Sequence, residues 1–71
     1  MQAKGNDEGT HPLRVAREDR DLSQGALAER AGVDRRTVIR TEQGTEPLVT
    51  TAIKLARGVG KRVEDLWGRG S

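Results

Sequence analysis

The middle of the sequence holds two short stretches of helical periodicity separated by three residues, the first of which is a glycine. The first, residues 24–31, begins after Ser23, a residue favoured at helix N-caps, and is followed by Gly32. The second, residues 35–43, is followed by Gly44. Glycine adopts the left-handed conformation that ends helices at little cost. The pattern therefore predicts two short helices joined by a tight turn.

Helical patterns also flank this pair on both sides. Pro12 fits the first turn of a helix capped by Thr10 or His11, and that helix runs to about Arg20, where Asp21 breaks it. Two further helices are expected after the pair, in residues 49–58 and 62–67. Each has apolar residues at helical spacing: Val49, Ala52, Leu55 and Ala56 with Val59 directly after the first of these helices, and Val63 and Leu66 in the second. Five short helices are expected in all.

The composition supports an all-α domain. The chain has 71 residues, is 32% hydrophobic and contains one aromatic residue, Trp67, which is too little for the core of a β-sandwich. Cysteine is absent, and His11 is the single histidine, so disulfides and a metal site are not expected. No phosphate-cradling loop or nucleophile–base pair is visible, and we expect neither enzymatic activity nor a cofactor. His11 is interpreted as a surface or capping residue.

The chain is expected to form one domain. Residues 1–10 are polar and without apolar periodicity, which indicates a disordered N-terminal arm. Residues 11–67 form the expected domain, and residues 68–71 a frayed end. No apolar run approaches a membrane span or a signal-peptide core, so we expect a soluble cytoplasmic protein. The net charge of +2 points only weakly to nucleic acid.

The second helix of the central pair, capped by Asp34, has two faces of different character. At about 100° per residue, Val38 and Thr41 share its inner face with Asp34. Its outer face has no carboxylate and carries Arg35, Arg36, Ile39, Arg40 and Gln43. Arginine presents a fork that matches guanine, glutamine can pair with adenine, and isoleucine can meet a thymine methyl group. This face is interpreted as a DNA-reading surface, with a merely solubilising basic face as the alternative.

Several segments along the chain carry a family resemblance: Leu22–Gln24, Leu27–Val33, Thr37–Val38, Glu42–Gly44, Lys54–Ala56 and Val63–Trp67. Over residues 12–67 the sequence resembles the phage repressor and Cro class of helix-turn-helix regulators. The resemblance implies a compact, lambda-repressor-like bundle of five short helices. It also implies a sequence-specific regulator of transcription, a repressor, that inserts its third helix into the major groove of double-stranded DNA.

The resemblance also assigns roles to individual residues. Base contacts are implied for Arg35, Arg36, Ile39 and Arg40. Phosphate contacts are implied for Gln24, Thr37 and Gln43, and for Gly44 and Thr45 through their backbone amides. Arg17 and Glu42 resemble a pair in which an arginine of the first helix binds a glutamate at the end of the recognition helix, with an architectural function.

The packing of the two central helices follows from three positions. Ala28 allows the helices to cross closely, Gly32 supplies the turn, and Val38 closes the wedge between them. Two neighbouring positions depart from the family pattern, because Thr41 stands at a usually apolar core position and Ile39 at a usually polar one. A rotated third helix, with Ile39 buried and Thr41 exposed, is therefore an alternative.

The expected partner is a palindromic DNA operator bound by a homodimer, without a membrane or a small-molecule ligand. Trp67 and the last helix are candidates for the subunit interface, and a role of Trp67 as a lid on the core is the alternative. The competing function is an antitoxin-like or other protein-interaction module on the same helical fold, which would dock a partner through Leu48, Ile53 and Trp67.

Overall fold

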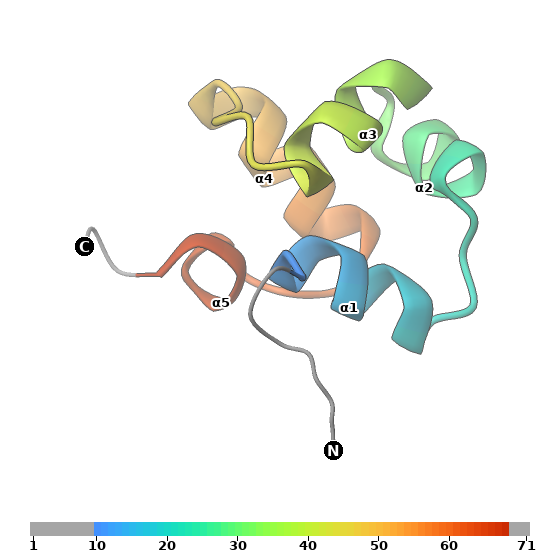
Figure 1. Cartoon of the computed structure of the whole chain (residues 1–71), viewed down its shortest axis with the longest axis horizontal. Coiled ribbons are helices and arrows are strands. Elements are labelled where there is room, and N and C mark those ends of the chain that lie inside the picture. The colour runs from blue at the N-terminus through green and yellow to red at the C-terminus, as the bar shows by residue number, and fades with distance from the viewer. Residues whose placement is uncertain (1–9, 69–71) are drawn as a thin grey trace.

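The computed structural model describes residues 10–68, which form an all-helical fold without a β-strand in that range. The five helices are shown in Figure 1 and run in the order α1 (Pro12–Asp19), α2 (Gln24–Ala31), α3 (Arg35–Glu42), α4 (Val49–Gly58) and α5 (Val63–Trp67). The all-α fold of five short helices expected from the sequence is confirmed. The expected disordered arm and frayed end lie, apart from Thr10 and Gly68, outside the described residues.

Local sequence signals define the first two helices. His11 is the N-cap of α1, and its Nδ1 accepts a hydrogen bond of 2.9 Å from the backbone N–H of Leu13. Ser23 caps α2 in the same way, since its Oγ accepts from the N–H of Ala26 at 3.0 Å. Gly32 has a φ of 76° and ends α2 in the left-handed conformation. These capping predictions are confirmed.

The later helices differ slightly from expectation. Asp34 occupies the N-cap of α3 but is exposed and makes no side-chain capping hydrogen bond, so its placement on the inner face was wrong. Preceding the first turn, it lies beyond the surface that α3 packs against the core. Helix α3 ends at Glu42, with Gln43 as its C-cap. The N–H of Arg62 donates to Asp65 Oδ2 at 3.0 Å, and α5 begins one residue later than expected.

The core fills the space enclosed by the helices. Five aliphatic side chains are fully buried, and together they represent every helix except α5: Leu13, Leu27, Val38, Leu55 and Val59. Leu66 adds α5 to this cluster, and Val63 and Trp67 pack against it while staying partly exposed. Alanines such as Ala28 and Ala56 occupy the close helix crossings. The predicted inward direction of Leu66 is confirmed.

Two residues of α4 behave differently from their sequence interpretation. Val49 was expected on the buried face, but its side chain is 75% exposed, because the first residue of α4 extends beyond the helices that cover Ala52 and Leu55. In the sequence, Gly58 is expected to weaken the end of its helix, because glycine has a low helix propensity. In the structure it is buried. A Cβ there would lie 2.7 Å from Leu27 Cδ1, so this glycine allows α4 to approach α2.

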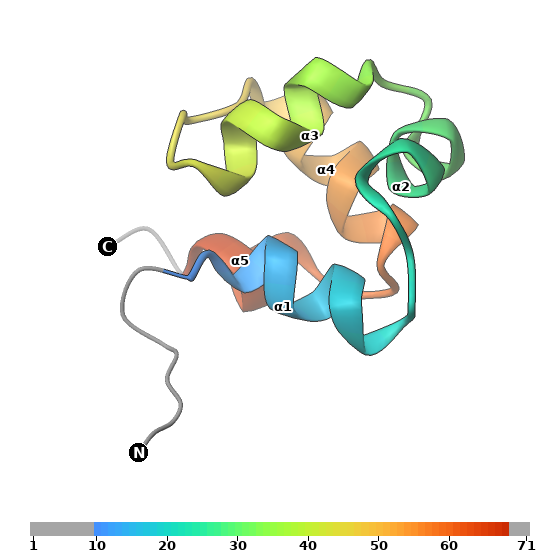
Figure 2. The ribbon, with the colours of Figure 1, turned by 45° about the vertical axis from the view of Figure 1, so that its right-hand side comes forward.

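The helices are arranged so that α3 lies at one edge of the molecule. Figure 2 shows α3 along the top, with α1 and α5 side by side at the opposite end and α4 between them. One side of α3 packs on α1 and α2, which leaves its other side to solvent. None of the helices within residues 10–68 is long and apolar enough to cross a membrane.

Candidate nucleic-acid interface

The connection between α2 and α3 holds these helices at a fixed angle. The backbone N–H groups of Gly32 and Val33 both donate to the carbonyl of Ala28 at 2.9 Å, which closes the end of α2. Ala28 is buried where the helices cross, and Val38 is fully buried on the inner face of α3. Of the three residues that were expected to set the angle, Ala28 and Val38 are therefore buried in the core and Gly32 lies in the turn.

The outer face of α3 is basic and exposed. Arg35, Arg36, Arg40 and Gln43 are exposed, and Ile39 is half-buried beside them. None of the three arginines forms an ion pair with a carboxylate in the part of the chain that the structure describes. Their guanidinium groups are therefore free to meet an anion.

The rotation of α3 decides which residues reach its outer face. Thr41 is only 2% exposed, whereas Ile39 keeps part of its surface in solvent. The rotated alternative, with Ile39 in the core and Thr41 outside, is therefore wrong. A threonine is accommodated in the core because its methyl group packs there and its hydroxyl can bond the backbone of its own helix.

Glu42, the carboxylate of α3, is turned away from the outer face. Arg17 of α1 donates to it through Nε at 2.6 Å and through Nη2 at 3.2 Å. Arg17 also donates through Nη1 to the carbonyl of Leu22, and both side chains of the pair are nearly buried. The pair joins α1 to the end of α3 and keeps the negative charge of Glu42 off the exposed surface.

Gln24 belongs to the same hydrogen-bond network. Its Nε2 donates to Glu42 Oε1 at 3.1 Å, so this side chain, half-buried at the start of α2, is held against the end of α3. The first backbone N–H groups of α2 have no partner within the helix, as at any helix N-terminus. Arg35 passes close by, since its Cδ lies 3.9 Å from the position of a Cβ on Gly25. The start of α2 thus adds amide donors next to an arginine.

The loop after α3 does not offer the donors that the sequence suggested. The N–H of Gly44 donates to the carbonyl of Thr41 at 3.0 Å, and that of Thr45 to the carbonyl of Arg40 at 3.0 Å. Both amides are used within the protein, so they are not available to a phosphate. The hydroxyl groups of Thr37 and Thr45 remain beside the loop.

A groove of about 240 Å³ runs between the outer side of α3 and the start of α4. It is lined by Thr37, Arg40 and Thr45, which the sequence singled out, and by Leu48 and Thr51, which it did not. Leu48 was considered only as a protein contact. Thr51 could have been considered from the sequence, because it lies in the first turn of the helix that follows the loop.

The geometry of α2, α3 and their turn can be compared with known families. A helix-turn-helix family model matches residues 13–66, which is most of the chain. The chain belongs to the helix-turn-helix family. The match runs from α1 into α5, so it includes α2, α3 and the turn at Gly32 between them.

Three archaeal proteins are similar in sequence, and their names describe them as HTH-type regulators, two of them uncharacterized and one putative. An HTH-type transcriptional regulator of Methanothermobacter thermautotrophicus is 39% identical over 57 residues, which cover 78% of this chain and 83% of that protein. One of Methanocaldococcus jannaschii is 36% identical over 56 residues, which cover 78% of this chain and 85% of that protein. An HTH-type transcriptional regulatory protein of Archaeoglobus fulgidus is 44% identical over 48 residues, or 68% of this chain, but the match spans only 16% of that protein.

Proposed function

We propose that this chain is a DNA-binding regulator of transcription that places α3 in the major groove of double-stranded DNA. The observation that carries the proposal is the outer face of α3, where three exposed arginines converge while Glu42, their nearest carboxylate in the helix, is bound by Arg17. Such a face attracts the phosphate backbone and presents donors to base edges. The names of the three archaeal relatives agree with this function.

In the proposed complex the outer face of α3 reads bases. Arg35 and Arg36, in the first turn of α3, would reach base edges, and guanine is the base that an arginine fork matches best. Arg40 follows one turn later as a deeper or flanking contact. Ile39, still partly exposed, would meet a thymine methyl group.

Phosphate contacts would flank these bases. Gln24 sits at the start of α2, where the helix dipole and unpaired amides favour an anion. One N–H of its Nε2 donates to Glu42, so the second N–H of the same nitrogen would donate to the phosphate. Thr37, Gln43 and the hydroxyl of Thr45 would bind the backbone on the other side of α3.

We propose further that the protein binds as a homodimer to a palindromic operator and acts as a repressor without enzymatic activity. One helix of eight residues reaches few base pairs, and two copies on one duplex double the sequence that is read. The resemblance to repressors of this class favours repression. A regulator of this kind works at the nucleoid, in the cytoplasm.

Salt dependence tests the proposal. We expect the affinity for a random duplex to fall about a hundredfold between about 50 and 200 mM salt, because several condensed counterions are released on binding. A variant with the three α3 arginines replaced by glutamine should lose this binding, whereas Arg14→Gln, which removes a charge of α1, should keep most of it. Binding that is absent, or that the α3 variant retains, would show that α3 is not the DNA-binding element.

A further inference from the structure

Leu48, where the loop after α3 meets α4, carries a large apolar side chain that the fold leaves in solvent. It is 76% exposed, more than any other large apolar side chain in residues 10–68. Its carbonyl accepts the first hydrogen bond of α4, from the N–H of Ala52 at 2.8 Å, so Leu48 is the N-cap of this helix. An N-cap usually carries Ser, Thr, Asp or Asn, whose oxygen binds a free N–H of the first turn, and Leu48 makes no such bond. The side chain therefore serves neither the core nor the helix end.

Leu48 lies beside the outer face of α3. The loop between α3 and α4 turns back in Figure 2, so the start of α4 lies next to α3. Leu48 lines the groove of about 240 Å³ at this place together with Thr37 and Arg40 of α3 and with Thr45 and Thr51. The arginine and the hydroxyl groups suit the phosphates of a DNA strand, whereas a leucine gains nothing from a phosphate. A partner for Leu48 has to be an apolar group of the molecule that binds there.

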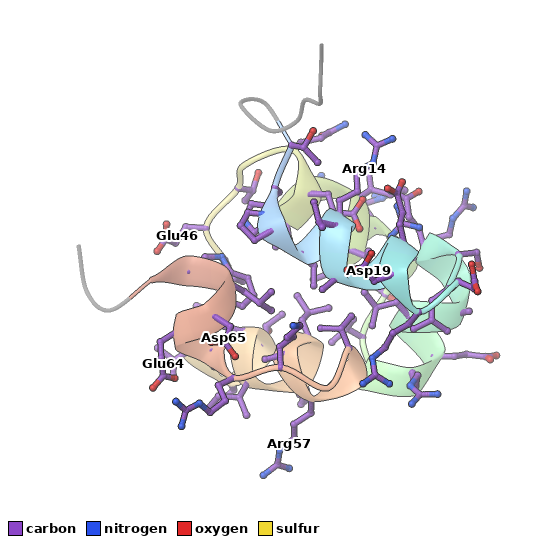
Figure 3. All side chains as sticks on the ribbon, turned by 90° about the horizontal axis from the view of Figure 1, so that it is seen from below. Arg14, Asp19, Glu46, Arg57, Glu64 and Asp65 are labelled. Atoms are coloured by element: carbon purple, nitrogen blue, oxygen red, sulfur yellow. The ribbon has the colours of Figure 1, made fainter. Side chains whose placement is uncertain are left out.

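The groove has no carboxylate among the residues that line it. Glu46, the carboxylate of the loop, lines the hollow beside α5 instead and points away from the molecule (Figure 3). Glu42, at the end of α3, is bound by Arg17. A strand of DNA can therefore reach Leu48 along the groove without meeting a negative side chain, which would repel its phosphates.

We propose that Leu48 packs against the 5-methyl group of a thymine at the edge of the base sequence that α3 contacts. This methyl group is the apolar group that base edges present in the major groove. Leu48 lines the same groove as Arg40, so it extends the base-reading face of α3 sideways onto the start of α4. The inference rests on the proposed function, because it requires α3 in the major groove.

Burial explains how a leucine at this position favours the complex. In the free protein the Leu48 side chain lies in water, and contact with a thymine removes apolar surface of both partners from water. The gain for one methyl group corresponds to a Kd that is about fourfold lower. A serine would cap α4 better and would raise the folding equilibrium constant about fivefold. The stability of the fold and the affinity for DNA should therefore change in opposite directions when serine replaces Leu48.

Replacement of single thymines by uracil tests the proposal, since uracil keeps the base pair and lacks only the methyl group. The probe is a duplex that the parent protein selects from a random library, with each thymine replaced in turn. We expect one position, at the edge of the contacted sequence, where uracil raises the Kd of the parent about fourfold. Leu48→Ser should bind the thymine duplex about fourfold more weakly and should not distinguish thymine from uracil at that position.

Three further variants serve as controls. Leu48→Ala shortens the side chain without adding a capping oxygen, and it should lose the same discrimination. Val15→Ala, at an exposed valine of α1, should bind both duplexes as the parent does. Ile39→Ala should remove the uracil effect at a different thymine and leave the one that depends on Leu48 intact. Urea unfolding should find Leu48→Ser at least as stable as the parent, which separates weaker binding from a damaged fold.

The outcomes separate this inference from the proposed function. A parent that binds its selected duplex without any uracil effect that depends on Leu48 overturns the thymine contact and leaves DNA binding standing. Equal weakening of the thymine and uracil duplexes by Leu48→Ser also overturns it, because Leu48 would then act through a sugar, a phosphate or the fold. A parent that binds no duplex in any selection contradicts the proposed function itself.

Discussion

The guanidinium group of Arg17 lies 2.6 Å from a carboxylate oxygen of Glu42 and donates to it through Nε, which ties α1 to the last turn of α3. The side chains are 11% and 5% exposed, respectively. Both therefore lose most of their hydration on folding, and each depends on the other for compensation. The pair fixes the orientation of the helix that carries the arginine face.

Removal of one partner of this pair should be costly. Glu42→Ala leaves the nearly buried Arg17 with only the carbonyl of Leu22 and a 3.9 Å ion pair with the half-exposed Glu18, and we expect the free energy of unfolding in urea to fall by about 3 kcal/mol. The double variant Arg17→Met, Glu42→Leu should recover most of that loss, since it removes both buried charges. A loss below about 0.5 kcal/mol for Glu42→Ala would mean that the pair behaves like one in solvent.

Replacement of Arg36 should change base preference rather than affinity in general. We expect Arg36→Ala to relax selectivity at one operator position and to cost about 1–3 kcal/mol on the preferred sequence. Arg14→Ala, which removes an exposed arginine of α1, is the matched control and should alter no base preference. Binding to a set of operators with single substitutions measures both. Equal weakening on every sequence would assign Arg36 to a phosphate instead.

Two glycines in helices should respond in opposite directions to alanine. Gly58→Ala adds a methyl group 2.7 Å from the fully buried Leu27 side chain, and we expect a loss of about 1–2 kcal/mol although alanine favours the helix. At Gly25 the nearest atom would be 3.9 Å away, so Gly25→Ala should be neutral or stabilise by up to about 1 kcal/mol. Urea unfolding decides, and a more stable Gly58→Ala protein would contradict the close packing of α2 and α4.

The stability of the domain should fall in mild acid because of His11. Burial lowers the pKa of His11 below its ordinary value, although the charge of Glu42 opposes this shift. In its neutral form the ring accepts the capping bond from Leu13 and packs edge-on against Trp67 at 5.7 Å. The proton therefore binds more tightly to His11 in the unfolded chain than in the folded domain. The contribution is therefore complete above the ordinary pKa of about 6.5 and is lost as the pH falls through the lowered pKa.

The comparison that isolates this effect uses His11→Asn, which keeps a capping side chain without a titrating ring. Between pH about 7.5 and about 5 the parent should lose more unfolding free energy than the variant. Equal losses in both proteins would show that carboxylates alone cause the change.

The helices could be predicted from the sequence because their signals are local. Pro12 with His11, Ser23 and Gly32 each mark a helix end through one or two backbone positions, and these ends are where the structure has them. The rotation of α3 about its axis could not be predicted from hydrophobic periodicity alone. Thr41 and Ile39 exchange the usual polarity of their positions, and only their burial in the folded domain distinguishes the two orientations.

Features that depend on contacts between distant elements could not be predicted in detail. The exposure of Val49 depends on how far the neighbouring helices extend, and periodicity contains no information on that. The hydrogen bonds that occupy the amides of Gly44 and Thr45 depend on how the chain leaves α3. The bond from Gln24 to Glu42 joins residues 18 positions apart, so it emerges only once α2 and α3 have packed.

Selection of bound sequences from a random library of duplexes tests the central claim most directly. The account predicts a single enriched motif with guanines at positions read by arginines, arranged as two inverted half-sites, and an affinity about a thousandfold or more above that for random duplex. Loss of the motif on replacement of Arg35 and Arg36 would tie it to α3. A library that shows no enrichment after repeated rounds would contradict sequence-specific DNA binding.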